Sequence, residues 1–162
     1  MTIISDFYKG KATDQSGRNL INILAMSDED LEKDHMYIQY LFPNREPSHI
    51  NPDAPLLDDE TVEEIKSRSD IIEVVRICLK RMTDFYKMDE VHPWWATENN
   101  HNYLRMTRIL NTLREFGMHE ELNMFFRKLL IIFGNNEVIS WLTFNYWLVA
   151  VGLKQGIAGV NK

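Results

Sequence analysis

The sequence predicts an all-α protein that folds as a single compact multi-helix bundle, with about six or seven helices and a long proline-rich loop. Nearly every long segment between Gly and Pro residues repeats apolar positions with the helical period. No segment with the alternating period of a strand exceeds a few residues. A chain of 162 residues, 44% of them hydrophobic, can bury about two thirds of its unfolded surface in one core. We therefore expect a single domain over residues 1–162, with its core over about 6–153 and a frayed tail over 154–162.

The first helices are predicted from their caps and apolar stripes. Arg18–Met26 is short and apolar on one side. Ser27 is a typical N-cap residue, and the acidic side chains after it favour the positive end of a helix dipole. We expect the helix after this cap to run to about Leu41. Within it, His35 and Gln39 are four positions apart and would share one face.

A long loop and two further helices come next. Prolines forbid regular structure across FPNREPSHINPDAPLL, because each fixes its own φ and biases the preceding residue away from helix. These prolines are Pro43, Pro47, Pro52 and Pro55. Asp58 can cap an acidic helix over about Asp59–Lys66. Ser69 or Asp70 can cap the next helix, Ile71–Tyr86, whose apolar positions match the helical period and should face the core.

Three helices are expected in the second half of the chain. The first covers about His101–Phe116, and Gly117 stands where a residue in the left-handed conformation ends many helices. Glu120–Phe133 repeats this design and should end at Gly134. Asn136 is expected to cap the last, strongly apolar helix.

Composition narrows the function classes and the compartment. The formal net charge is −6, from 24 acidic and 18 basic residues, and no basic run is visible, so we expect no nucleic-acid partner. Cys78 is the only cysteine, which excludes an intramolecular disulfide and favours a reducing, cytoplasmic location. The N-terminal residues lack the pattern of a secretory signal.

One segment raises the question of a membrane. Val138–Leu153 is almost wholly apolar over sixteen residues, fewer than the roughly twenty that span a bilayer. Polar side chains at Ser140, Thr143 and Asn145 interrupt it. We therefore expect a buried core helix, and peripheral membrane association through Trp141–Leu153 is the alternative.

A candidate ligand-binding group lies at the start of the helix that begins near His101. Asn102, Arg105 and Arg108 are three positions apart and lie along one side of that helix. Two guanidinium groups near a helix N-terminus can hold a carboxylate or a phosphate. In the alternative interpretation, the arginines pair with the acids of Asp58–Glu64 and only fasten the long loop.

A second candidate group lies in DHMYIQYLFP. His35 and Gln39 are polar side chains inside an otherwise apolar stripe, so both must find hydrogen-bond partners. Those partners could belong to a ligand or to the backbone of the proline-rich loop. The loop has many carbonyls and amides to satisfy, so anchoring of the loop is the simpler interpretation.

The sequence offers no metal or cofactor site. No two of the five histidines have the spacing that places two ligands on one helix face. No phosphate-binding glycine loop, HExxH, GxSxG or calcium loop is present. We therefore expect neither a metal nor a cofactor, and we assign no catalytic residue.

Several segments together resemble the conserved N-terminal region of the opioid growth factor receptor family, in its bacterial-type, domain-only form. They are FYKGKATDQSGR, SDEDLEKDHMYIQYLFPNREPSHINPDAPLL and NHNYLRMTRILNTLREFG. The resemblance runs from about Asp6 to Val151, and the long signature over His35–Pro55 departs from the family at Tyr40, where Trp is common. It implies a helical domain, and the family name implies that animal members bind a small opioid peptide. The residues that match polar positions of the family are His35, Gln39, Asn51, Asn102, Arg105 and Arg108.

We expect this chain to be a cytoplasmic helical binding or interaction module rather than an enzyme. Its ligand would be a protein, a peptide or a small anion, bound in a cleft between the proline-rich loop and the helix that begins near His101. The alternative is a small enzyme that acts on an anionic metabolite, with His35 or His101 as general base and the two arginines as a clamp.

Overall fold

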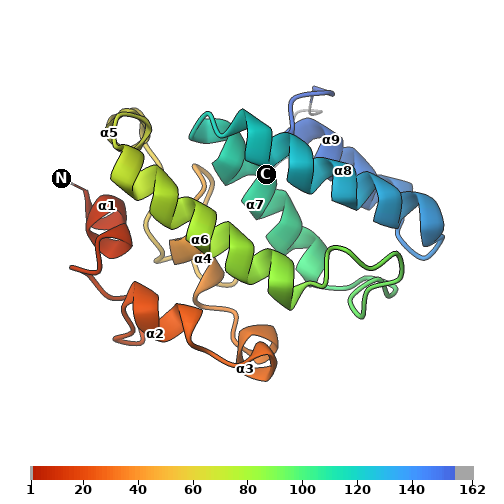
Figure 1. The fold of residues 1–162 in the computed structure, drawn as a ribbon, viewed down its shortest axis with the longest axis horizontal. Coiled ribbons are helices and arrows are strands. Elements are labelled where there is room, and N and C mark those ends of the chain that lie inside the picture. The colour runs from red at the N-terminus through yellow and green to blue at the C-terminus, as the bar shows by residue number, and fades with distance from the viewer. Residues whose placement is uncertain (1, 156–162) are drawn as a thin grey trace. The chain divides into compact units, whose positions relative to one another are not determined.

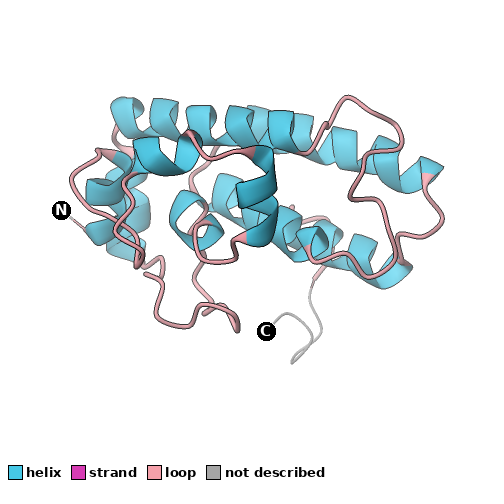
Figure 2. Cartoon of the chain, turned by 90° about the horizontal axis from the view of Figure 1, so that it is seen from below, coloured by secondary structure: helices cyan, strands magenta, loops and turns pink. Residues whose placement is uncertain are grey.

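The structure is a computed structural model, and it describes residues 2–155. Most of the tail predicted over 154–162 lies outside the described residues. Within the described residues there are nine helices and no strand, which confirms the all-α class and roughly the expected number of helices (Figures 1 and 2). The chain divides into two compact units, the N-terminal unit Met1–Arg81 and the C-terminal unit Met82–Lys162. The single-domain organisation stays a prediction.

The N-terminal unit begins with two short helices that the sequence encodes through reciprocal caps. At the start of α1 (Ile3–Tyr8), the side chains of Thr2 and Ser5 each accept a hydrogen bond from the backbone N–H of the other residue. In α2 (Leu20–Leu24), Asn19 and Asn22 do the same. α1 was not predicted, and it packs against α4 (Ile38–Leu41) and α5 (Asp59–Lys66).

The helix that was expected to run from Ser27 to about Leu41 is broken. Ser27 is the predicted N-cap of α3 (Asp28–Lys33), and its hydroxyl accepts from the backbone N–H of Asp30 at 3.1 Å. The helix ends at Asp34, whose backbone is extended and whose carboxylate accepts from the backbone N–H of Met36 at 2.7 Å. This local bond replaces helical hydrogen bonds, and the chain becomes helical again only in α4.

Both helices predicted after the proline-rich loop are present, but the second begins earlier than predicted, so that Ser69 and Asp70 lie inside its first turn and do not cap it. α5 spans the expected residues, and the carboxylate of its N-cap Asp58 accepts from the backbone N–H of Thr61 at 2.8 Å. α6 (Ser69–Phe85) buries a continuous apolar stripe that includes Val75, with an exposed fraction of 0%. Burial raises the pKa of the Cys78 thiol on this stripe to about 12, so the thiol stays protonated and unreactive at neutral pH.

The C-terminal unit contains three longer helices, α7 (Asn102–Glu115), α8 (His119–Asn135) and α9 (Trp141–Ala150), and α7 packs against both of the others. Gly117, after α7, has φ 68°, as predicted for a residue that ends a helix.

Two predicted boundaries in this unit were wrong. Gly134 does not end α8, which continues to Asn135. Asn136 does not cap the last helix, because its amide group donates to the carbonyls of Val91 and Ile132, both at 2.7 Å. Ser140 caps α9 instead and accepts from the backbone N–H of Thr143 at 3.1 Å. Among the described residues, no helix is both long and apolar enough to cross a membrane.

Candidate functional site

In the N-terminal unit, two nearly buried amides hold the proline-rich loop to the segment around α4. Gln39 is 4% exposed and Asn51 is 1% exposed. The amide of Asn51 donates to the side-chain oxygen of Gln39 and to the carbonyl of Met36, both at 3.4 Å. The hydroxyl of Ser48 accepts from the amide of Gln39 at 3.4 Å and from the backbone N–H of Asn51 at 3.2 Å. The structure therefore brings Gln39 and Asn51 together, although they are twelve positions apart.

His35 does not share a helix face with Gln39, which corrects the expectation drawn from their spacing. His35 lies in the break between α3 and α4. The amide of Gln39 donates at 3.0 Å to the backbone carbonyl of His35, not to its ring. This bond supports the loop-anchoring interpretation of Gln39, because its partner is backbone next to the loop's attachment point.

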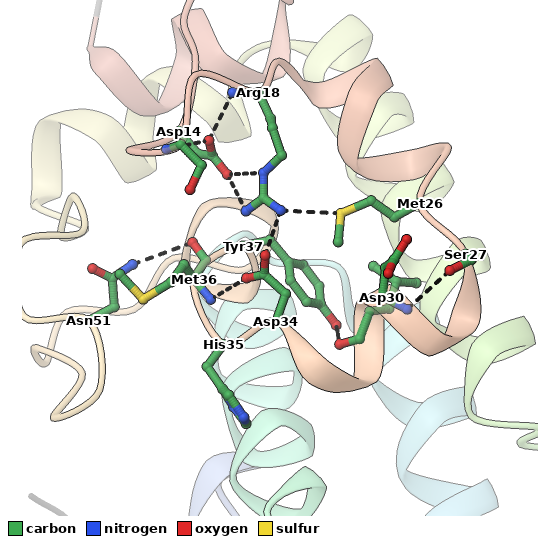
Figure 3. Close-up of polar contacts among 12 residues, drawn as sticks. Asp14, Arg18, Met26, Ser27, Asp30, Asp34, His35, Met36, Tyr37 and Asn51 are labelled. Atoms are coloured by element: carbon green, nitrogen blue, oxygen red, sulfur yellow. Dashed lines mark hydrogen bonds and ion pairs between the residues drawn. The ribbon is translucent and has the colours of Figure 1, made fainter.

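Sequence reasoning missed an ion-pair cluster in the same unit, shown in Figure 3. The guanidinium group of Arg18 lies 2.7 Å from the carboxylate of Asp14 and 2.6 Å from that of Asp34. The Asp14 side chain is fully buried. Burial acts to lower the pKa of Arg18, but the hydrogen bonds to Asp34 and Asp14 outweigh it and raise that pKa. Asp14 and Arg18 flank a turn and do not lie on a helix, so their spacing of four gave no helical signal for this pair.

Arg81 is a second residue that links elements of the N-terminal unit and that sequence reasoning missed. Its guanidinium group donates to the carbonyls of Leu24 at 3.1 Å and Met26 at 2.7 Å. It also lies 3.0 Å from the carboxylate of Asp28. Arg81 therefore ties the link between α2 and α3 to α6. Both Arg18 and Arg81 hold short elements of the N-terminal unit in place.

In the C-terminal unit, the first turn of α7 carries a buried polar group. Asn102 is 0% exposed and Arg105 is 5% exposed. The side-chain oxygen of Asn102 accepts from the guanidinium group of Arg105 at 3.2 Å and from the Tyr86 hydroxyl at 3.1 Å. Asn102 is itself fixed, because its backbone N–H donates to the side chain of Asn100 at 2.9 Å. The predicted association of Asn102 with Arg105 is therefore present, with Tyr86 as an additional member.

Arg108 follows one turn later on the same side of α7 and is half-buried. Burial lowers the pKa of Arg108 from its ordinary value to about 10. A shift in this direction means that its surroundings disfavour the charged form of the guanidinium group. An anion brought into such poorly solvated surroundings would interact with the guanidinium group more strongly than in water.

Aromatic side chains form the frame behind this polar group. The Trp95 indole N–H donates to the carbonyl of Tyr86 at 2.7 Å, and the Trp147 indole N–H donates to the carbonyl of Tyr103 at 3.3 Å. The rings of Tyr86, Trp95, Tyr103 and Trp147 follow one another at centroid distances of 6.0 to 6.1 Å. This rigid chain of rings fixes the start of α7, and with it the positions of Asn102 and Arg105.

The histidines do not provide a metal centre in the described part of the chain, where no group of three or more His, Cys, Asp or Glu side chains could hold a metal ion. His101 is exposed at the start of α7. His92 lies on the loop before α7, where its ring nitrogen contacts the side-chain oxygen of Asn136 at 3.0 Å.

The chain is similar to proteins of one family. It matches the model described as "Opioid growth factor receptor (OGFr) conserved region" over residues 5–93. It is 34% identical over 103 residues to the opioid growth factor receptor-like protein 1 of Xenopus tropicalis, which covers 55% of this chain and 20% of that protein. It is 33% identical over 131 residues to the opioid growth factor receptor of Rattus norvegicus, which covers 69% of this chain and 22% of that protein. The human receptor is 35% identical over 103 residues, 54% of this chain and 15% of that protein.

The chain thus spans about a fifth of the length of the first two relatives. No solved structure matches it significantly. The family model covers the segment that contains His35, Gln39 and Asn51, and it ends before α7 with Arg105 and Arg108. Because the model covers more than half of the sequence, the chain belongs to the family of the opioid growth factor receptor conserved region.

Proposed function

We propose that this chain is a cytoplasmic helical binding module that holds an anionic group, the carboxylate of a peptide or of a small anion, on α7 through Arg105 and Arg108. The observation that carries the proposal is the placement of two partly or nearly buried guanidinium groups one turn apart on the same side of α7, at Arg105 and Arg108. The pKa of Arg108, which burial lowers, supports it. A charged side chain in surroundings that disfavour its charge lowers the stability of the free protein. An anionic ligand would offset that cost, so part of the binding energy would come from it.

Arg105 is suited to a directional role in this site. Its bond to the side-chain oxygen of Asn102 fixes one edge of the guanidinium group. A guanidinium group held in one orientation loses little rotamer entropy when it binds a carboxylate through two parallel N–H bonds. Asn102 would act as a positioning residue, since the Tyr86 hydroxyl and the backbone of Asn102 hold it in turn.

We propose a separate role for the polar group of the N-terminal unit. Gln39 and Asn51, with the backbone of His35, would keep the proline-rich loop in one conformation. The loop tip exposes Ile50, whose exposed fraction is 57%. A loop that is already ordered loses less conformational entropy on binding, so it could contact a protein or peptide partner with a smaller unfavourable entropy.

The names of the relatives favour a peptide as the partner. Three of them are receptors for an opioid growth factor by name. A short peptide carries a terminal carboxylate, the group that a pair of guanidinium groups binds best. The enzyme hypothesis, with His35 or His101 as general base, stays a prediction.

The experiment is a thermal-shift and calorimetric comparison of short peptides with a free C-terminal carboxylate and the same peptides amidated. A carboxylate peptide at one hundred times its Kd should raise the free energy of unfolding by about 2.7 kcal/mol. The amidated peptide should give a clearly smaller shift. Arg108→Met should abolish the difference, whereas Arg76→Met, at an arginine of α6 paired with Glu73, should retain it.

Two results would contradict the proposal. The first is equal stabilisation by the carboxylate and amidated peptides. The second is a carboxylate effect that survives in Arg108→Met and in Arg105→Lys.

A further inference from the structure

One face of α9 is apolar and open to solvent. The segment Trp141–Leu153 contains no charged side chain. Trp141, Leu142 and Leu153 are 72%, 58% and 69% exposed. A helix that is apolar all round is expected to be buried on every side, as the sequence predicted for this one. The structure buries only one side, which corrects that prediction.

Helical geometry makes the exposed face continuous. The buried side carries Phe144, Trp147 and Ala150, spaced by three. The opposite side carries Leu142 and the half-exposed Tyr146 and Val149, spaced by four and three. That spacing places the three side chains in one stripe, with the pattern of the seam between two paired helices.

Both ends of the stripe are held in place. At its start, the Trp141 ring packs edge-on against Phe133 at 5.1 Å and Phe144 at 6.0 Å between ring centroids. After the end of α9, Gly152 takes φ 84°, and the backbone N–H of Leu153 donates to the carbonyl of Leu148 at 2.9 Å. This arrangement folds Leu153 back against the last turn. Contacts therefore hold the apolar face at both ends, at Trp141 and at Leu153.

We propose that this face of α9, defined by Trp141, Leu142, Tyr146, Val149 and Leu153, is the interface of a symmetric homodimer. Two-fold symmetry brings a patch against its own copy, so the patch must be complementary to itself. An uncharged apolar stripe meets this condition, whereas a charged patch would repel its copy. α9 of one protomer would pack along α9 of its partner.

The exposed area is sufficient for such an interface. The three strongly exposed side chains, Trp141, Leu142 and Leu153, and the half-exposed Tyr146 and Val149 together present apolar surface on the order of 500 Å² per protomer. This area is near the upper limit for an apolar patch on a monomer. Two copies would bury about 1,000 Å² in total, the lower limit for a specific interface. We therefore expect a dimer in concentration-dependent exchange with the monomer.

Charge argues against a membrane surface as the occupant. The chain has a net charge of −6, and the link between α8 and α9 carries Glu137. The basic residue that follows the face, Lys154, donates to the side chain of Asn145 at 2.8 Å. Amphipathic helices that bind anionic lipid carry basic residues on their polar side, and α9 has none.

The experiment is sedimentation velocity of the full chain from about 1 to 300 µM. The wild type should shift from monomer to dimer within this range. Leu142→Glu should weaken dimerisation by about 100-fold or more, because it places a carboxylate from each protomer in the apolar interface. Met124→Glu, a matched change at a 49% exposed position on α8, should dimerise like the wild type. Circular dichroism should show native helix content in both variants.

Three outcomes would overturn the proposal. A wild type that stays monomeric throughout the range excludes the dimer. A dimer that Leu142→Glu and Trp141→Ser leave unchanged places the interface elsewhere. A monomer that binds neutral or anionic vesicles through Trp141, seen as a blue shift of its fluorescence, identifies a lipid surface as the occupant.

Discussion

Arg18 in the N-terminal unit and Arg108 in the C-terminal unit are both partly buried arginines with opposite electrostatic surroundings. Two carboxylates close to Arg18 raise its pKa despite burial. Burial lowers the pKa of Arg108 to about 10. The carboxylates around Arg18 offset the cost of burying its charge, and the ion pairs stabilise the fold. Burial makes the charge of Arg108 costly, and in our proposal a ligand offsets that cost.

The largest effect is expected from Arg18→Leu. It leaves the fully buried carboxylate of Asp14 without its ion pair, which should lower the free energy of unfolding by about 3 kcal/mol. Urea denaturation measures the loss. The double variant Arg18→Leu/Asp14→Leu should recover a large part of it. A loss below about 1 kcal/mol would mean that the pair behaves like an exposed one.

A smaller loss is expected from Asn102→Ala. The substitution removes the acceptor shared by Arg105 and the Tyr86 hydroxyl, so the free energy of unfolding should fall by about 2 kcal/mol. The control Asn123→Ala, at an exposed position of α8, should fall within about 0.5 kcal/mol of the wild type. Equal stability of Asn102→Ala and the control would show that this polar group does not stabilise the unit.

Arg108→Met should have the opposite sign. The methionine fills a similar volume without a charge to desolvate, so the variant should be as stable as the wild type or more stable by up to about 2 kcal/mol. The same variant should lose the carboxylate-dependent shift described above. A destabilisation as large as that of Arg18→Leu would show that Arg108 also stabilises the fold through its contacts, which would contradict the difference between the two arginines.

The smallest effect is a dependence on alkaline pH. Because the folded-state pKa of Arg108 is below its value in the unfolded chain, the cost of its charge is fully present below about pH 10 and decreases as the pH rises above that value. The stability difference between Arg108→Met and the wild type should therefore shrink from pH 9 to pH 12. The raised pKa of Arg18 predicts that the difference between Arg18→Leu and the wild type stays constant there. If the two stability differences changed with pH in the same way, that result would contradict the opposite pKa shifts of Arg108 and Arg18.

The sequence determined those features that depend on neighbours along the chain. Ser27 and Asp58 cap helices within three residues of themselves, so their local signal was sufficient. The proline-rich loop and the turn at Gly117 follow from backbone conformations that Pro and Gly impose. The association of Asn102 with Arg105 was predictable for the same reason, since the two residues lie one helical turn apart.

Features that depend on distant partners escaped prediction. The break at Asp34 competes with a continuing apolar stripe, and a carboxylate paired with Arg18, sixteen residues earlier, favours the break. Asn136 is as good an N-cap as Ser140 by residue type, but the carbonyl of Val91 engages its amide. Gln39 and Asn51 are in contact because the proline-rich loop folds back against α4, and the spacing of residues along a helix cannot predict such a contact.

The sequence alone determined that α9 would be a helix, that it would be apolar and that it would be too short to span a bilayer. Only the tertiary structure decided which of its sides faces the core. A helix with apolar residues all round has no periodic difference between its faces, so its orientation depends on the partners available. Phe126 and Phe133 of α8 stack on Phe144, and this contact turns Leu142 and Val149 outward.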